Sequence, residues 1–314
     1  MMLARVADSL YWIGRYIERA EHLSRLSDVM LTATLDQNEA AIAVAQLALA
    51  AVGDAGERLE GGSPYDAVRA MVFDREDVGS VVTSLARARE NARQVRDQIT
   101  TETWERLNLL YLRSTAAKAE KDFAKSSSAF LHEIIADLHL FKGAADATMS
   151  RGPGYRFLML GVYLERAQLI ARLLDVCFGE RAGGRPLDDH LAQMSVLRMA
   201  CALEPYLRVY TSEIRPRYLL EFLLFDEEFP RSIRFSTSRI EEHLTSLTRQ
   251  AEYAGRAGPE RLAGRLSARL QFADMDEGEG PGALLSVVVA ECSRIHHAIY
   301  ETFVAYPLEM RLPA

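Results

Sequence analysis

The sequence predicts an all-α protein built as a tandemly duplicated helical bundle, with about six helices in each repeat. Three observations predict this class. Apolar residues recur at steps of three and four, no segment keeps the two-residue alternation of a strand, and one stretch occurs twice. That stretch runs from Tyr11 to Val29 and returns 147 positions later. The repeat predicts one bundle over residues 1–150 and a second over residues 151–314, either separate or sharing one core.

Two blocks carry the repeat. In the first block, Gly14, Tyr16, Glu18, Arg19, Ala20, Arg25, Leu26, Asp28 and Val29 return as Gly161, Tyr163, Glu165, Arg166, Ala167, Arg172, Leu173, Asp175 and Val176. In the second block, 152 positions apart, Pro64, Phe73, Asp74, Glu76 and Ser80 return as Pro216, Phe225, Asp226, Glu228 and Ser232. The change of offset predicts five additional residues between Gly179 and Arg215.

Six helices are expected in the first half. The apolar residues Leu3, Val6 and Leu10 begin an amphipathic helix that continues to about Thr34. The other five are predicted at residues 39–51, 64–73, 78–99, 102–123 and 128–149. Ser63 is the expected N-cap of the helix at 64–73, and Asp77 that of the helix at 78–99.

The sequence Arg-Gly-Pro-Gly at 151–154 is the strongest break in the chain, and six more helices follow it. They are predicted at residues 155–178, 189–210, 216–224, 230–253, 259–272 and 282–306. Pro205 predicts a kink in the helix at 189–210.

Composition excludes several classes of protein. The 314 residues are 49% hydrophobic and 26% charged, as in an ordinary globular protein, and a net charge of -7 argues against nucleic-acid binding. No apolar stretch reaches the roughly 18 residues of a membrane span. Three widely spaced cysteines fit neither a disulfide framework nor a zinc motif, and we expect reduced thiols in a cytoplasmic protein.

The chain lacks the motifs of common catalytic sites. It contains no Walker A sequence, no Gly-x-Gly-x-x-Gly and no Gly-x-Ser-x-Gly. His132 and His139 are seven residues apart, which is not a metalloprotease spacing, and no Glu stands three residues before a His. The sequence therefore predicts no metal site, no cofactor and no nucleotide site.

The two Glu-Arg helices differ in their surroundings. On a helical wheel, Glu18 lies in a polar stripe with Tyr11, Arg15, His22 and Arg25. The helix around the second glutamate is apolar on nearly every face, which is typical of the centre of a bundle.

Glu165 is therefore expected to be desolvated and to pair with Arg172, with Arg166 or with an arginine from the other half. Three readings stay open for such a carboxylate. It forms a buried ion pair that fixes helix register, it belongs to a ligand or partner site, or it acts as a general acid or base.

Two further places carry arginines. Arg89, Arg93 and Arg96 share one face of the helix at 78–99, where they would grip a carboxylate or phosphate, or pair within an exposed helix. Nearby Asn91 fits either a site or the core. In the second half, Arg231 falls in the expected first turn of the helix at 230–253, which predicts either an anion site or simple capping.

At these motifs the chain resembles the bacterial Alpha-E family, a helical domain with a Glu-Arg motif. The resemblance rests on six blocks in the same order and covers nearly the whole chain. The blocks lie at Met2 to Glu21, Ala88 to Arg93, Trp104 to Asn108, Arg151 to Gly154, Leu164 to Ala167 and Pro230 to Ser232.

The resemblance implies association with other proteins. Alpha-E proteins are typically encoded with, or fused to, a circularly permuted ATP-grasp protein, and often accompany a transglutaminase-like protein or a proteasome-like hydrolase. ATP-grasp enzymes join a carboxylate to an amine. We therefore expect a helical partner subunit of an ATP-grasp amide-ligase system for peptide synthesis or modification, without a nucleotide site of its own.

Two alternatives remain. The chain is a free-standing enzyme with Glu18 or Glu165 as general acid or base in a polar cavity between the repeats, or it is a pure assembly scaffold. The residues expected to face a ligand are Arg15, Glu18, Arg19, Arg89, Asn91, Arg93, Glu165, Arg166 and Arg231.

Overall fold

The computed structural model describes residues 4–34, 39–53, 59, 62–179, 190–211, 213–249, 258–273, 275 and 280–305. All regular structure in these ranges is helical, which confirms the all-α class. The helices are α1 (Ala4–Thr34), α2 (Glu39–Ala51), α3 (Pro64–Phe73), α4 (Val81–Gln94), α5 (Thr101–Ser114), α6 (Ala119–Lys125), α7 (Ser127–Thr148), α8 (Pro153–Phe178), α9 (His190–Met199), α10 (Leu203–Tyr210), α11 (Pro216–Phe225), α12 (Ile233–Thr248), α13 (Gly258–Gln271) and α14 (Pro281–Ile299), followed by a π-helical turn at Tyr300–Val304.

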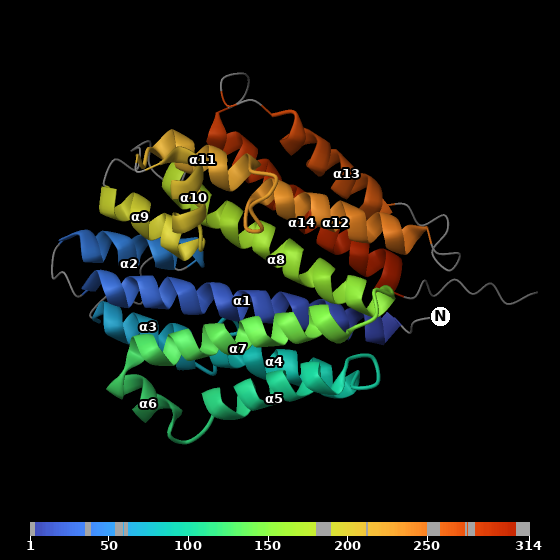
Figure 1. Ribbon diagram of the computed structural model, residues 1–314, viewed down its shortest axis with the longest axis horizontal. Coiled ribbons are helices and arrows are strands. Elements are labelled where there is room, and N and C mark those ends of the chain that lie inside the picture. Colours follow the sequence, from blue (N-terminus) through green and yellow to red (C-terminus); the bar gives the residue numbers. More distant parts are fainter. Residues whose placement is uncertain are drawn as a thin grey trace, which may run out of the picture.

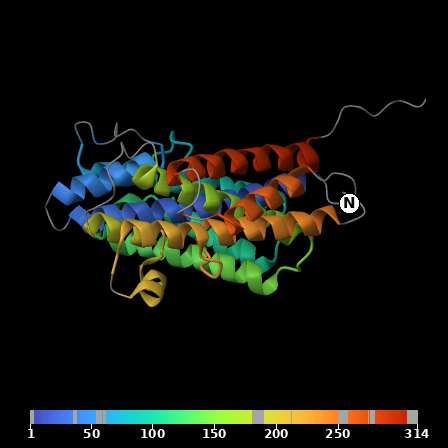
Figure 2. The same ribbon diagram turned by 90° about the horizontal axis from the view of Figure 1, so that it is seen from above.

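The two Glu-Arg helices, α1 and α8, lie side by side through the middle of the molecule (Figure 1). Helices α3 to α7 lie on one side of this pair, and α9 to α14 lie on the other. Helix α2 packs against α1, α8 and α9. Seen from above, most of the long helices follow the long axis of the molecule (Figure 2). The central position of α1 and α8 explains why the glutamates of both Glu-Arg motifs are buried.

Close contact between α1 and α8 depends on two glycines. A Cβ atom added at Gly14 would lie 2.0 Å from the carbonyl oxygen of Leu158, and one added at Gly161 would lie 2.0 Å from the carbonyl oxygen of Tyr11. The contact is reciprocal, because Tyr11 and Leu158 occupy equivalent positions in the sequence repeat. Only glycine lets the two backbones approach this closely.

Buried apolar side chains from both halves of the chain form one hydrophobic cluster within the described residues. Leu10 and Ile17 of α1 and Leu164 and Leu173 of α8 belong to it, and all four are essentially inaccessible to solvent. The halves are therefore joined by apolar packing as well as by the glycine contact. None of the helices in the described ranges combines the length and apolar composition needed to cross a bilayer.

Two predicted continuous helices are each divided. The described residues therefore form seven α-helices, rather than about six, on each side of residue 150. The helix expected at 102–123 stops at Ser114 and resumes as α6. The interruption places Phe123 in a cluster of aromatic rings. Its ring centroid lies 5.7 Å from that of Tyr65, 5.3 Å from that of Phe73 and 5.8 Å from that of Phe130. Tertiary packing thus overrides the local helix signal here.

The helix expected at 189–210 also breaks, but not at Pro205. The break lies between α9 and α10, where Cys201 has a φ of 55°. Pro205 lies in the first turn of α10, where a backbone N–H would have no partner within the helix. The predicted kink at Pro205 is therefore wrong.

Helix caps confirm one prediction and correct two. Ser63 caps α3 in a capping box with Asp66. Helix α4 begins at Val81 with Ser80 as N-cap, so Asp77 is not the cap that was expected. Asp77 accepts a bond from the amide of Gly79 at 2.7 Å instead. Ser232 is likewise the N-cap of α12, which places Arg231 before the helix rather than in its first turn.

Equivalent residues make equivalent bonds before α4 and α12. Asp74 accepts a bond from the amide of Glu76 at 2.9 Å, and Asp226 accepts one from the amide of Glu228 at 2.9 Å. The duplication itself stays a prediction from the sequence.

Candidate functional site: a buried glutamate–arginine network

Three buried carboxylates lie where α1 packs against α8. Glu18 and Glu21 come from α1 and Glu165 comes from α8, and their exposed fractions are 1%, 0% and 3%. Ionised carboxylates at such burial need several cationic or N–H partners to offset the loss of water.

The two Glu-Arg motifs exchange partners across the helix contact. Arg166 donates to Glu18 through two bonds, from Nε to Oε1 at 2.8 Å and from Nη2 to Oε2 at 2.9 Å. Arg19 donates from Nε to Oε1 of Glu165 at 2.7 Å. Each carboxylate is therefore held by the arginine of the other motif, in the geometry that makes guanidinium–carboxylate pairs strong.

Arg15 completes the surroundings of Glu165. Its Nε donates to the carboxylate, its Nη1 donates to the hydroxyl of Tyr11 at 2.8 Å, and its Nη2 donates to Oε1 of Gln168 at 2.7 Å. The hydroxyl of Tyr11 lies 2.8 Å from Nδ1 of His296. These bonds join α1, α8 and α14 in one polar chain.

Lys142 and Arg231 bridge the other two carboxylates. Lys142, from α7, donates to both Glu18 and Glu21 and lies 2.5 Å from Oε2 of Glu21. Arg231 donates from Nη1 to Oε1 of Glu18 at 3.2 Å and from Nη2 to Glu21. Because Arg231 precedes α12, the network connects the outer layers of both halves to α1.

Arg25 and His139 extend the network to the surface. Arg25 donates from Nη2 to Oε1 of Glu21 at 2.8 Å, and Nε2 of His139 lies 3.1 Å from the same oxygen. The side chain of Arg25 is 14% exposed and that of His139 is 54% exposed. Glu21 is thus one point at which the buried network reaches solvent-accessible groups.

The cations keep the carboxylates ionised. Burial alone would raise the pKa of Glu18, but the charges of Arg166, Lys142 and Arg231 outweigh it and hold that pKa well below its ordinary value. Arg15 and Arg19 overcome burial in the same way and lower the pKa of Glu165.

His22 lies among these charges in its neutral form. Complete burial, with the positive charge of Arg231 as a further cause, lowers the pKa of His22 to about 4. Its Nε2 atom has no hydrogen-bond partner among the described residues.

This arrangement favours a structural role over acid or base chemistry. A general base works best with a pKa near the working pH and with access to a substrate proton. Glu18 and Glu165 have lowered pKa values, and arginine donors occupy their oxygens. In the described part of the chain, His, Cys, Asp and Glu side chains form no group of three or more that would hold a metal ion.

Six of the residues expected from the sequence meet in this network. They are Arg15, Glu18, Arg19, Glu165, Arg166 and Arg231. Of the partners considered for Glu165, arginines from the other half are the ones observed, while Arg166 serves Glu18. Arg231 neither stands alone as an anion site nor caps a helix, because its guanidinium binds Glu18 and Glu21.

The arginines of α4 lie elsewhere. Arg89 donates to Oδ1 of Asn108 at 2.7 Å and lies over the ring of Tyr111. Arg93 pairs with Glu90 on an exposed helix face. Asn91 is half-buried on the same helix. The bonds of Arg89 and Arg93 run to α5 and within α4, not to the network.

Sequence reasoning missed several members of the network. Glu21 carried a signal, since it stands three residues after Glu18 and shares its helix face. No such signal marked Lys142, His139 or Gln168, because the local sequence of α7 and α8 does not indicate which residues of α1 they contact.

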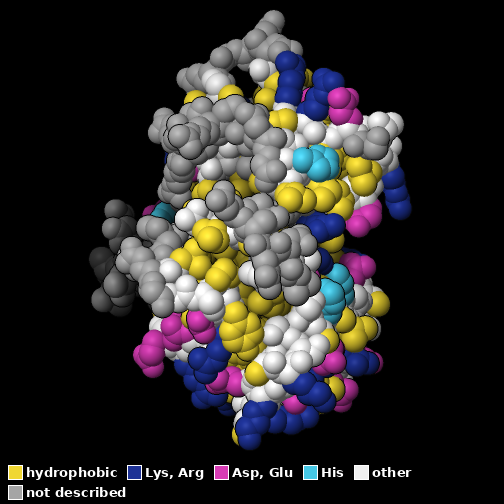
Figure 3. Space-filling view, turned by 90° about the vertical axis from the view of Figure 1, so that its left-hand side faces the viewer, with side chains coloured by type: hydrophobic (Ala, Val, Ile, Leu, Met, Phe, Trp, Pro, Cys, Tyr) yellow, Lys and Arg dark blue, Asp and Glu magenta, His cyan; other side chains and the backbone are white. Residues whose placement is uncertain are grey.

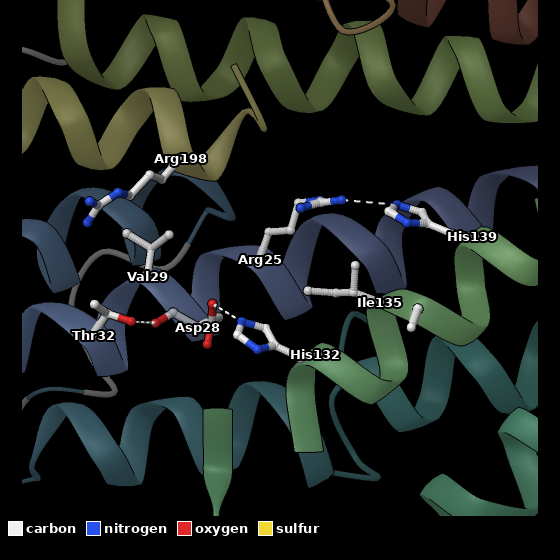
Figure 4. A pocket seen from close by; sticks show the side chains of 9 residues that line it. Arg25, Asp28, Val29, Thr32, His132, Ile135, His139 and Arg198 are labelled. Carbon is white, nitrogen blue, oxygen red and sulfur yellow. Dashed lines mark hydrogen bonds and ion pairs between the residues drawn. The ribbon is translucent and has the colours of Figure 1, made fainter. Parts of the chain in front are cut away.

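A pocket of about 540 Å³ opens beside the Glu21 end of the network, between α1, α7 and α9. Arg25 and Asp28 of α1, His132 and His139 of α7 and Arg198 of α9 line it (Figure 4). In the space-filling view the surface is indented at its right-hand edge, with Lys or Arg and His side chains beside the indentation (Figure 3).

Together these features define an all-α protein whose two central helices exchange Glu-Arg ion pairs. The chain belongs to the Alpha-E family, described as a predicted alpha-helical domain with a conserved ER motif, and the family model matches residues 2–304.

Curated relatives are longer than this chain. It is 25% identical over 302 residues to uncharacterised proteins of Mycobacterium bovis and Mycobacterium tuberculosis, in an alignment that covers 88% of this chain and 33% of each relative. The chain therefore spans about a third of the length of these relatives. No solved structure is significantly similar to it.

Proposed function

We propose that this chain is a helical partner subunit of an ATP-grasp amide-ligase system for peptide synthesis or modification, working in the cytoplasm. It docks on the circularly permuted ATP-grasp ligase and helps to bind the acceptor, while the ligase binds ATP. Transglutaminase-like and proteasome-like proteins are further partners in the same system.

One observation carries the proposal. The family's defining polar residues join the chain's own helices, since Glu18 and Glu165 are each bound by the arginine of the opposite motif. A motif used in this way builds a rigid body and leaves the outer surface to bind partners. The length of the relatives agrees with a module that works beside further polypeptide, because this chain matches only 33% of them.

The enzyme alternative has less support. It needs Glu18 or Glu165 to exchange protons with a substrate, and both carboxylates are buried, ionised and paired. Neither glutamate lines the pocket between α1, α7 and α9.

The test uses the ATP-grasp ligase from the same genome. Purified chain and ligase, mixed at micromolar concentration, are expected to co-elute from a size-exclusion column as a stoichiometric complex. Amine-dependent release of ADP by the ligase is then expected to rise when the chain is added. Separate elution together with unchanged ADP release would overturn the proposal.

A further inference from the structure

The pocket between α1, α7 and α9 has a chemistry of its own. Val29 and Ile135 give it apolar wall, while Arg25 and Arg198 bring positive charge from two different helices. A volume of about 540 Å³ is typical of a site for a small organic molecule. Arg198 extends from α9 near Val29 (Figure 4).

The side chain of Arg198 is exposed, and none of the described residues forms an ion pair with it. The carboxylate of Asp28, which lines the same pocket, already has partners for both of its oxygens. Its Oδ2 lies 2.9 Å from Nε2 of His132, and its Oδ1 accepts a bond from Ser128 at 2.6 Å.

The floor behind the pocket carries surplus positive charge. Glu18 and Glu21 are shared by four cations, namely Arg25, Lys142, Arg166 and Arg231. This concentration of positive charge stands out in a chain whose net charge is -7. An excess of positive charge around a cleft attracts small anions, and here the arginines outnumber Asp28, the one acidic residue among the described residues that line the pocket.

We propose that this pocket binds a small organic anion. The guanidinium group of Arg198 holds its carboxylate or phosphate group, since planar N–H donors suit both anions. Arg25, whose guanidinium is bound to Glu21, adds positive charge to the pocket wall. Val29 and Ile135 pack against the apolar remainder of the molecule. The site is independent of docking on a ligase and would exist in the isolated chain.

The test measures anion binding by calorimetry on the full chain. The probes are inorganic phosphate, phenyl phosphate and hexanoate, each compared with sodium chloride at equal ionic strength. At least one probe is expected to bind at millimolar concentration or below. Arg198→Ala should weaken that binding about tenfold or more, because it removes charged hydrogen bonds.

Arg208→Ala is the matched control. Arg208 is an exposed arginine on the neighbouring helix α10 and does not line the pocket. It changes the net charge equally and should leave the affinity unchanged.

The probes also distinguish the source of the anion. Binding of the two phosphates alone assigns a phosphate monoester, and binding of hexanoate alone assigns a carboxylate. Binding of both kinds supports the shared chemistry. The proposal is overturned if no probe binds at millimolar concentration, or if Arg198→Ala and Arg208→Ala bind the probes equally well.

Discussion

At the scale of single residues, the main feature is a set of carboxylates that stay charged without water. Burial of a lone carboxylate would favour its protonated form. Glu18 stays ionised because Arg166 donates two hydrogen bonds to it and because Lys142 and Arg231 also donate to it. Removing such a carboxylate leaves buried cations without a counter-charge, which costs more than the pair itself contributes.

Glu18→Gln should therefore lower the free energy of unfolding by about 3–5 kcal/mol, the range for breaking a buried ion pair. Urea denaturation followed by circular dichroism measures the change. Glu90→Gln is the matched control, because Glu90 pairs with Arg93 on an exposed face of α4 and should show no measurable change. Equal effects of the two substitutions would contradict the structural role of the network.

Titration of His22 should make stability depend on pH. Its pKa is lowered to about 4 in the folded protein, against an ordinary value of 6.5. Between these values the unfolded chain binds the extra proton, so the free energy of unfolding falls as the pH falls. The loss reaches up to about 3 kcal/mol near pH 4.

This dependence is checked by urea denaturation at neutral pH and at about pH 5, where His residues rather than carboxylates dominate proton uptake. His22→Gln should reduce the difference between the two conditions without abolishing it, because burial also lowers the pKa of His243 and that of His296 to about 4. His297→Gln is the control, because His297 is exposed on α14, and it should leave the difference as in the native chain. An unchanged difference in His22→Gln would show that His22 does not contribute to the pH dependence.

At the scale of helices, the contact between α1 and α8 sets the geometry of the network. The helices touch backbone to backbone at Gly14 and Gly161, and the Glu-Arg motif begins one turn further along each helix. A larger side chain at either glycine would separate the helices. The same separation would lengthen the Glu-Arg bonds, so packing and electrostatics support each other here.

Gly14→Ala should destabilise the protein by at least about 1–3 kcal/mol, the usual cost of forcing extra volume into a packed interior. Thermal unfolding measures this effect. Gly143→Ala provides the control, since Gly143 lies in α7 and a Cβ atom there meets nothing within 4 Å. It should stabilise the protein by about 0.5–1 kcal/mol. A tolerated Gly14→Ala would mean that the helices are not as close as described.

At the scale of the whole molecule, the two halves depend on each other. The carboxylates of Glu18 and Glu21 lie in the first half, while Arg166 and Arg231, which bind them, lie in the second. The hydrophobic cluster also runs through both halves. Neither half can bury its central helix without the other.

A fragment of residues 1–149 is therefore expected not to unfold cooperatively, because it lacks α8 and exposes the apolar and charged face of α1. Circular dichroism during thermal unfolding checks this. The control is the full chain, folded first and then cut at a protease site inserted before Arg151, in the turn between α7 and α8. The cut chain should stay associated and keep its transition. A cooperative transition in the isolated fragment would show that the first half is an independent domain.

The sequence by itself determined the helical class, most helix positions and the burial of Glu165, because these follow from spacing within one turn or a few turns of helix. It also singled out six members of the network, four of which, Glu18, Arg19, Glu165 and Arg166, form the repeated Glu-Arg motif. The sequence did not predict the interruption before α6, because that break depends on the packing of Phe123 against Phe73 and Phe130.

Only the tertiary structure decided which arginine binds which glutamate. Arg166 binds Glu18, 148 positions away, and Lys142 reaches Glu18 and Glu21 from α7. Helical periodicity tells which face of a helix a residue occupies, but it carries no information on which other face lies opposite. The packing of α1 on α8, α7 and the segment before α12 supplies that information, and with it both the network and the pocket beside Arg198.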